Sequence, residues 1–262
     1  MAENPVIRKF GAATRAGAVQ TPSAVDLQKL YDQPSYTGPR PAQRFMTLDD
    51  VVQRTGAMLL TLLAAGAVSW TLTTTRVAVP LLIVSLIGAL GLGLYMSFTL
   101  KANAALCLTY SVLEGLLLGT ISRLFEEAYH GIVVQALTGT VMVAGGMLFV
   151  YKIGAIRVTP KFTRIVVGAT IGVFGLMLVN LVAYLFTPDG LGLRSGGALA
   201  IVFSLLCIVV AAMNLVLDFD MVEQGIRNGA DQKFAWFASF GITVTLVWLY
   251  LEILRLLSFL RD

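Results

Sequence analysis

The sequence predicts an all-α polytopic membrane protein with seven transmembrane helices, and its composition and charge distribution carry that prediction. Of the 262 residues, 57% are hydrophobic and only 13% are charged, and the mean hydropathy is +0.81. Soluble domains are about 45–50% apolar and about 25% charged. The charges are also bunched, and the apolar stretches between them are roughly 18–25 residues long, enough to cross a bilayer as a helix. These observations exclude an ordinary soluble globule, a coiled coil, a collagen-like fibre and a disordered chain.

Residues 1–45 precede the first apolar stretch and are rich in small and polar residues. Four of their prolines, Pro22, Pro34, Pro39 and Pro41, break any helix there. The segment lacks the apolar core of a secretory signal. We expect residues 1–45 to be a disordered cytoplasmic tail and residues 46–262 to be the membrane domain.

The ordered part is predicted to begin at Met46. Thr47 and Asp50 have the spacing of a capping box, in which each side chain satisfies a free amide of the first helical turn. Asp49 adds a second acid at the positive end of the helix dipole. A short interfacial helix is therefore expected to lead into the first span.

Seven apolar runs follow. Breakers separate several of them, such as Pro160 in the fourth connection and the Pro188-Asp189-Gly190 turn in the fifth. The sixth helix is expected to continue beyond its apolar run to a stop at Asn228-Gly229. In order, the runs are Gly56–Thr74, Val77–Leu100, Ala102–Ser122, Gly131–Tyr151, Arg164–Phe186, Gly197–Leu217 and a span within Phe234–Leu260.

Most of the 19 lysines and arginines lie in residues 1–54 and in the second, fourth and sixth connections. Cytoplasmic loops carry an excess of these residues. The distribution predicts a cytoplasmic N-terminus and a C-terminus on the outer side. Because the basic residues mark the ends of spans, we expect a lipid bilayer and no nucleic acid as the partner.

The sequence offers little material for catalysis or for a resident metal. His130 is the only histidine, and Cys107 and Cys207 lie in separate apolar runs. A zinc site needs about four converging ligands. We expect no disulfide, no cofactor and no enzyme activity.

Pairs of glycines at a spacing of four recur within the spans, as in Gly115 with Gly119 and Gly168 with Gly172. Small residues at this spacing let helix backbones approach closely in lipid. Both pairs are therefore predicted to lie at helix–helix contacts.

Acids within the spans are the candidate functional groups, because a charged group inside a bilayer is costly. Glu114 lies near the middle of the third run. It is either a carboxyl on a cation or proton path, or a hydrogen-bonded acid that orients helices.

Asp218 and Asp220 end the sixth run and point to nearly opposite sides of a helix. Asn214 lies one turn before Asp218 and shares its face. Either one of the two acids faces the bundle and titrates, or both are interfacial charges.

Glu252 lies in the seventh run, with Arg255 as a local ion-pair partner. Its depth depends on where the span begins. A start at Phe234 puts it near the outer face, and a start near Gly241 puts it near mid-membrane.

These segments resemble the Bax inhibitor-1 family of seven-span membrane proteins, in its bacterial branch. The resemblance rests on four strings and covers residues from Met46 to the C-terminus. The strings are Met46-Thr-Leu-Asp-Asp-Val, Leu113-Glu-Gly-Leu-Leu-Leu-Gly, Asn214-Leu-Val-Leu-Asp-Phe-Asp and Trp248-Leu-Tyr-Leu-Glu-Ile-Leu-Arg-Leu-Leu.

The resemblance implies a central seventh helix surrounded by six others and a pH-sensitive calcium leak in the inner membrane. It also implies a sensor pair of acids: Asp220, with Asp218 as the alternative, and Glu252. This chain departs from the family in having Glu at the second position and a longer stretch between the two sites. Transient calcium is the one ligand expected.

The competing hypothesis is a non-transporting regulator that binds membrane proteases or stress-response complexes. An intramembrane aspartyl hydrolase is disfavoured, because Asp218 and Asp220 diverge.

Overall fold

The computed structural model describes residue 28 and residues 44–73, 76–188 and 190–261. The predicted disordered tail lies outside these residues, apart from residue 28 and its last two positions. Residues 44–262 form one compact unit. Within the described part, seven helices are long and apolar enough to span a membrane. They are α3 (Leu48–Leu72), α4 (Ala78–Thr99), α5 (Ala104–Ala128), α6 (Ile132–Lys152), α7 (Pro160–Ala183), α8 (Gly197–Arg227) and α9 (Phe234–Phe259).

The predicted signals for the start of the first helix and the end of the sixth span's helix are both present. Thr47 caps α3: its hydroxyl accepts from the Asp50 amide at 3.2 Å, and an Asp50 carboxylate oxygen accepts from the Thr47 amide at 3.1 Å. The interfacial lead-in and the first span are one continuous helix. As predicted, α8 continues past its apolar run, and it ends at Arg227, with Gly229 in the left-handed region at φ +65°.

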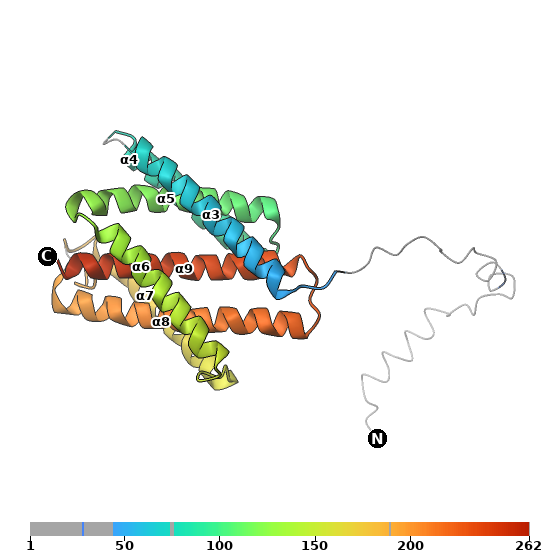
Figure 1. Cartoon of the computed structure of the whole chain (residues 1–262). Coiled ribbons are helices and arrows are strands. Elements are labelled where there is room, and N and C mark those ends of the chain that lie inside the picture. The colour runs from blue at the N-terminus through green and yellow to red at the C-terminus, as the bar shows by residue number, and fades with distance from the viewer. Residues whose placement is uncertain (1–27, 29–43, 74–75, 189, 262) are drawn as a thin grey trace, which may run out of the picture. The chain divides into compact units, whose positions relative to one another are not determined.

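Helix α9 is the centre of the bundle, as the family resemblance implied. In the most apolar window of each helix, 67% of the residues of α9 are buried, against 50% for α5 and α8 and 17% for the others. Helices α3, α5, α6 and α8 pack directly around it. Figure 1 shows α9 running between α5 and α8. Helix α4 packs chiefly on α5, and α7 packs chiefly on α8.

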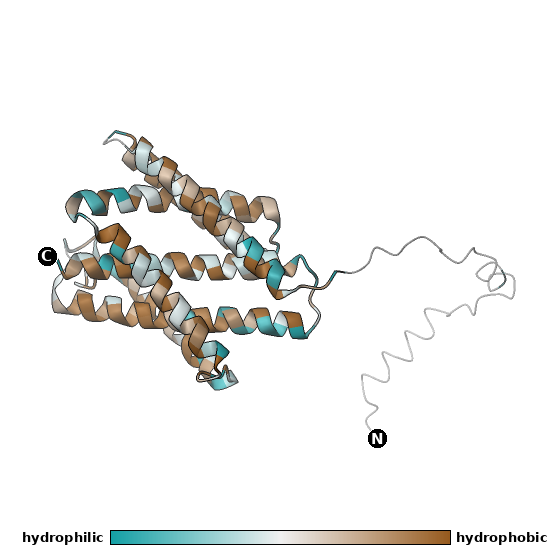
Figure 2. Ribbon diagram, in the orientation of Figure 1, coloured by the Kyte–Doolittle hydropathy of each residue, from teal (hydrophilic) through white to brown (hydrophobic). Residues whose placement is uncertain are grey.

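The brown colour of the outer helices in Figure 2 follows from this arrangement. Many of their large apolar side chains remain exposed, for example Phe98 at 83% and Phe149 at 64%. Hydrocarbon is the medium in which such a surface is stable. The protein is therefore a multi-pass membrane protein.

The prediction for one of the two glycine pairs is confirmed. A Cβ added at Gly115 would lie 2.3 Å from the Leu62 carbonyl oxygen, and one added at Gly119 would lie 2.2 Å from that of Gly66. Only glycine permits this approach of α3 and α5. The prediction for Gly168 and Gly172 is wrong, because no atom lies within 4 Å of a Cβ added at either. Their spacing is suited to a contact, but they lie on the outward face of α7.

The start of α3 is tied to the connection between α8 and α9. The Met46 amide donates to the Ala230 carbonyl at 2.8 Å, and the Gln232 amide donates to Arg44 at 2.9 Å. The Arg54 guanidinium and the Asp50 carboxylate both bind Gln232, at 2.5 and 2.7 Å. This set of bonds defines one end of the bundle. The opposite end carries the α7–α8 connection and the end of α9 (Figure 1).

Candidate functional site

Asp218 bridges α8 to the central helix. One of its carboxylate oxygens, Oδ2, accepts a hydrogen bond from the Thr245 hydroxyl of α9 at 2.6 Å. The other, Oδ1, lies 3.4 Å from the position that a Cβ at Gly241 would occupy. The acid therefore packs beside Gly241 of the central helix.

Asn214 does not join Asp218, although the two residues are one turn apart. Its amide nitrogen donates to the Thr170 hydroxyl of α7 at 2.7 Å and to the Val210 carbonyl at 2.9 Å. Asn214 therefore holds α7 to α8, whereas Asp218 holds α8 to α9. A spacing of four places two Cβ atoms on one face, but it does not decide which neighbouring helix each side chain reaches.

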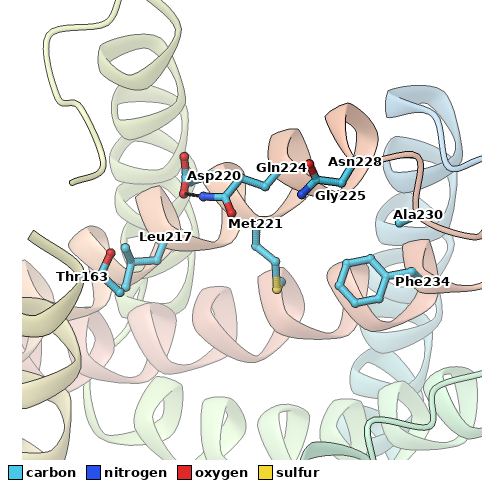
Figure 3. Close-up of a pocket in the computed structure, with 9 residues that line it drawn as sticks. All are labelled: Thr163, Leu217, Asp220, Met221, Gln224, Gly225, Asn228, Ala230 and Phe234. Carbon is cyan, nitrogen blue, oxygen red and sulfur yellow. Dashed lines mark hydrogen bonds between the residues drawn. The ribbon is translucent and has the colours of Figure 1, made fainter. Parts of the chain in front are cut away.

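Asp220 points away from Asp218, as the helical spacing predicted. Its Oδ2 accepts from the Gln224 amide at 2.5 Å. It lines a pocket of about 450 Å³ near the α8–α9 connection. Figure 3 shows the Asp220–Gln224 hydrogen bond on this wall, with Thr163 of α7 on one side and Phe234 of α9 on the other.

Met221 lies beside both this pocket and Gly241, the glycine that Asp218 approaches. Its side chain lines the pocket, and its Cε lies 3.5 Å from the position of a Cβ at Gly241. Asp218 meets the same glycine from its own side. Met221 is unbranched and flexible, so it is a side chain that can move without disrupting the helix. One adaptable side chain is thus in reach of both the pocket and the glycine beside the half-buried Asp218.

Glu252 is 2% exposed and lies toward the opposite end of α9. Its Oε1 accepts from Arg194 at 3.0 Å and from Arg255 at 3.2 Å. Arg194 comes from the α7–α8 connection and also contacts the Met177 sulfur at 3.2 Å. The second oxygen, Oε2, and the indole Nε1 of Trp248 are buried without a hydrogen-bond partner among the described residues.

The acids of α8 and α9 do not form a direct pair in this structure. Glu252 follows Thr245, the partner of Asp218, by seven residues, which is about 10 Å along a helix. Helix α9 is continuous from Phe234, so Glu252 lies about 27 Å from the start of the helix, and both expected depths of Glu252 in the membrane stay predictions.

Glu114 is the fourth acid and is separate from the other three. It is 7% exposed on α5 and interacts with the Tyr110 side chain one turn earlier. The Tyr110 ring in turn packs edge-on against Phe240 of α9, with centroids 5.0 Å apart. The acid is therefore linked to the central helix through an aromatic contact.

Two residues of this site, Arg194 and Thr245, carry no sequence signal that singles them out. No local pattern could pair Arg194 with Glu252, because 58 residues separate them. Thr245 lies one helical turn after Gly241. This pairing of a glycine with a hydroxyl is the local sequence feature at the contact.

Comparison with known proteins adds the family. The model of the family described as Bax inhibitor 1 like matches residues 4–262. This range extends the resemblance inferred from the sequence, which began at Met46, into the N-terminal segment. No match was found among curated proteins. Among the described residues, no three His, Cys, Asp or Glu side chains gather in the manner of a metal site.

Proposed function

Because the chain belongs to the Bax inhibitor 1 like family of proteins, we propose that it is a pH-sensitive cation leak with calcium as the permeating ion. The observation that carries this proposal is the position of Asp218. It is a carboxyl held between α8 and the central helix, and the residue before it in the chain, Leu217, lines a pocket that also includes a second acid, Asp220.

The pocket around Asp220 serves as the entry for the ion. Its polar lining includes a carboxylate and the side-chain amides of Gln224 and Asn228. Calcium prefers oxygen ligands of this kind and accepts irregular geometry. The carboxylate attracts the ion to the mouth, and Met221 blocks the way onward until the helices shift.

The bond between Asp218 and Thr245 is the gate. A hydrogen bond to an ionised carboxylate is roughly twice as strong as one between neutral groups. Protonation of Asp218 weakens this bond, so α8 separates more easily from α9 and Met221 is free to move. Flux is therefore expected to rise as the pH falls, because a proton at this position biases an element with two states.

Glu252 holds the far end closed. It anchors the α7–α8 connection to α9 through Arg194. Glu114 lies on the path or orients α5, and the flux of a Glu114→Gln variant decides between these roles. No chemical step is assigned to any of these acids, and we propose that the protein is not an enzyme.

Calcium flux into liposomes that contain the purified chain, measured over a range of pH, tests the proposal. Asp218→Asn is expected to abolish the pH dependence, and Asp220→Asn is expected to lower flux at every pH. Asp49→Asn is the matched control, because Asp49 is exposed in the first turn of α3. Unchanged flux in both the Asp218→Asn and the Asp220→Asn variants would refute the gate. A flux-silent protein that retains a membrane-protein partner would assign the chain to the non-transporting regulators.

A further inference from the structure

An apolar groove of about 780 Å³ lies between α3 and α6, and side chains of α5, α8 and α9 form its floor. Along α6 it extends from Val133 to Leu148, a rise of about 22 Å. Figure 1 shows α3 and α6 crossing the same side of α9. Side chains on both walls are exposed, such as Leu63 at 52% and Val141 at 69%. The groove therefore opens on the surface of the bundle that faces hydrocarbon.

The two ends of the groove differ in chemistry. At one end, the hydroxyls of Ser122 and Tyr250 are joined by a hydrogen bond of 2.6 Å in the floor, and Trp70 lies in the wall. The guanidinium of Arg123 lies over the Trp70 ring, 5.7 Å from its centroid. At the other end, Leu148 is part of a purely apolar lining. A groove with a cation at one end and apolar side chains along the rest fits an amphiphile.

We propose that this groove binds a phospholipid with an anionic headgroup, with one acyl chain between α3 and α6 and the phosphate at Arg123. Arginine presents a donor fork that matches a phosphate. Tryptophan is the side chain that favours the headgroup level of a bilayer. Arg123 keeps 36% of its side chain exposed, so its guanidinium is accessible there.

A lipid fits better than a helix from a partner protein. The groove rises about 22 Å along α6, whereas the hydrocarbon core that a transmembrane helix must cross is about 30 Å thick. Arg123 already pairs with Glu127 at 2.6 Å, and a phosphate can accept from the remaining donors of its guanidinium, whereas an apolar helix cannot. This proposal is independent of the cation leak, because none of the gating acids lines the groove.

Glycines on two helices make a matched test possible. No atom lies within 4 Å of a Cβ added at Gly145, which lines the groove, or at Gly168, which lies on the outward face of α7. The full chain is purified in detergent and delipidated, phosphatidylglycerol or phosphatidylcholine is added, and retained lipid is counted by native mass spectrometry. Gly145→Phe fills the groove and is expected to abolish retention of phosphatidylglycerol, whereas Gly168→Phe retains it. Ala67→Phe fills the groove from α3. It provides a second test if Gly145→Phe does not fold.

The headgroup contact is tested in the same assay. Arg123→Gln is expected to weaken retention of phosphatidylglycerol to the level of phosphatidylcholine, and the exposed Arg157→Gln is expected to leave it unchanged. Equal retention by the Gly145→Phe and Gly168→Phe variants would overturn the proposal. Loss of a co-purifying membrane protein from Gly145→Phe, with lipid retention intact, would also overturn it and assign the groove to a partner helix.

Discussion

Replacing Glu252 by glutamine removes the negative charge at the far end of the bundle and leaves the shape of the side chain almost unchanged. The carboxylate accepts hydrogen bonds from Arg194 at 3.0 Å and from Arg255 at 3.2 Å, and it is almost fully buried. The substitution therefore isolates the charge that joins the α7–α8 connection to the central helix.

The expected loss of unfolding free energy is large for a single substitution near one end of a bundle. Breaking a buried ion pair costs about 3–5 kcal/mol when the remaining charge stays buried. Arg194 and Arg255 keep 19% and 29% of their side chains exposed and can turn toward water. We therefore expect Glu252→Gln to lower the free energy of unfolding by about 3 kcal/mol, the lower end of that range.

Unfolding in mixed micelles with increasing sodium dodecyl sulfate measures this loss. A double-mutant cycle with Arg194→Gln isolates the pair, and its coupling energy is expected to be about 2 kcal/mol. The control is Arg123→Gln, which removes a pair with Glu127 that is shorter, at 2.6 Å, but exposed. The control should cost less than about 1 kcal/mol. A coupling energy between Arg194 and Glu252 as small as that of the exposed pair would refute the reasoning, because burial would then contribute nothing.

Three further substitutions test the packing, the cap and the gate. Gly119→Ala would place a Cβ 2.2 Å from a carbonyl oxygen of α3. It should lower the unfolding free energy by about 1–3 kcal/mol, whereas Gly168→Ala, where nothing lies within 4 Å, should not lower it. Thr47→Ala removes the cap of α3 and should cost about 1 kcal/mol, measured by thermal denaturation. Thr245→Val removes the hydroxyl that binds Asp218. It should raise calcium flux at neutral pH, and unchanged flux would argue against the gate.

The fold follows from the sequence because its determinants are local. Apolar runs of the right length are sufficient to place the spans, and the Thr47 cap and the stop at Gly229 are signals read over a few residues. Hydropathy does not predict the end of a helix whose last turns are polar. Helix α5 continues to Ala128, although its apolar run ends at Ser122, because charged residues in the last turns remain helical outside the hydrocarbon.

The candidate site could be predicted only in part, since its contacts join distant segments. Composition and position single out the four acids, and helical geometry correctly separates Asp218 from Asp220. The partner of each buried acid depends on how the helices pack, and that packing has no local signature. Glycine spacing has the same limit, because it shows that a close contact is possible and not which face of a helix forms it.

The tie between the start of α3 and the α8–α9 connection has a mechanical consequence. Ala230 accepts the Met46 amide and also lines the pocket that contains Asp220. The chain therefore joins the bundle at the mouth of the proposed ion entry. Any displacement of Met46 is therefore transmitted through its hydrogen bond to Ala230, a residue of that mouth.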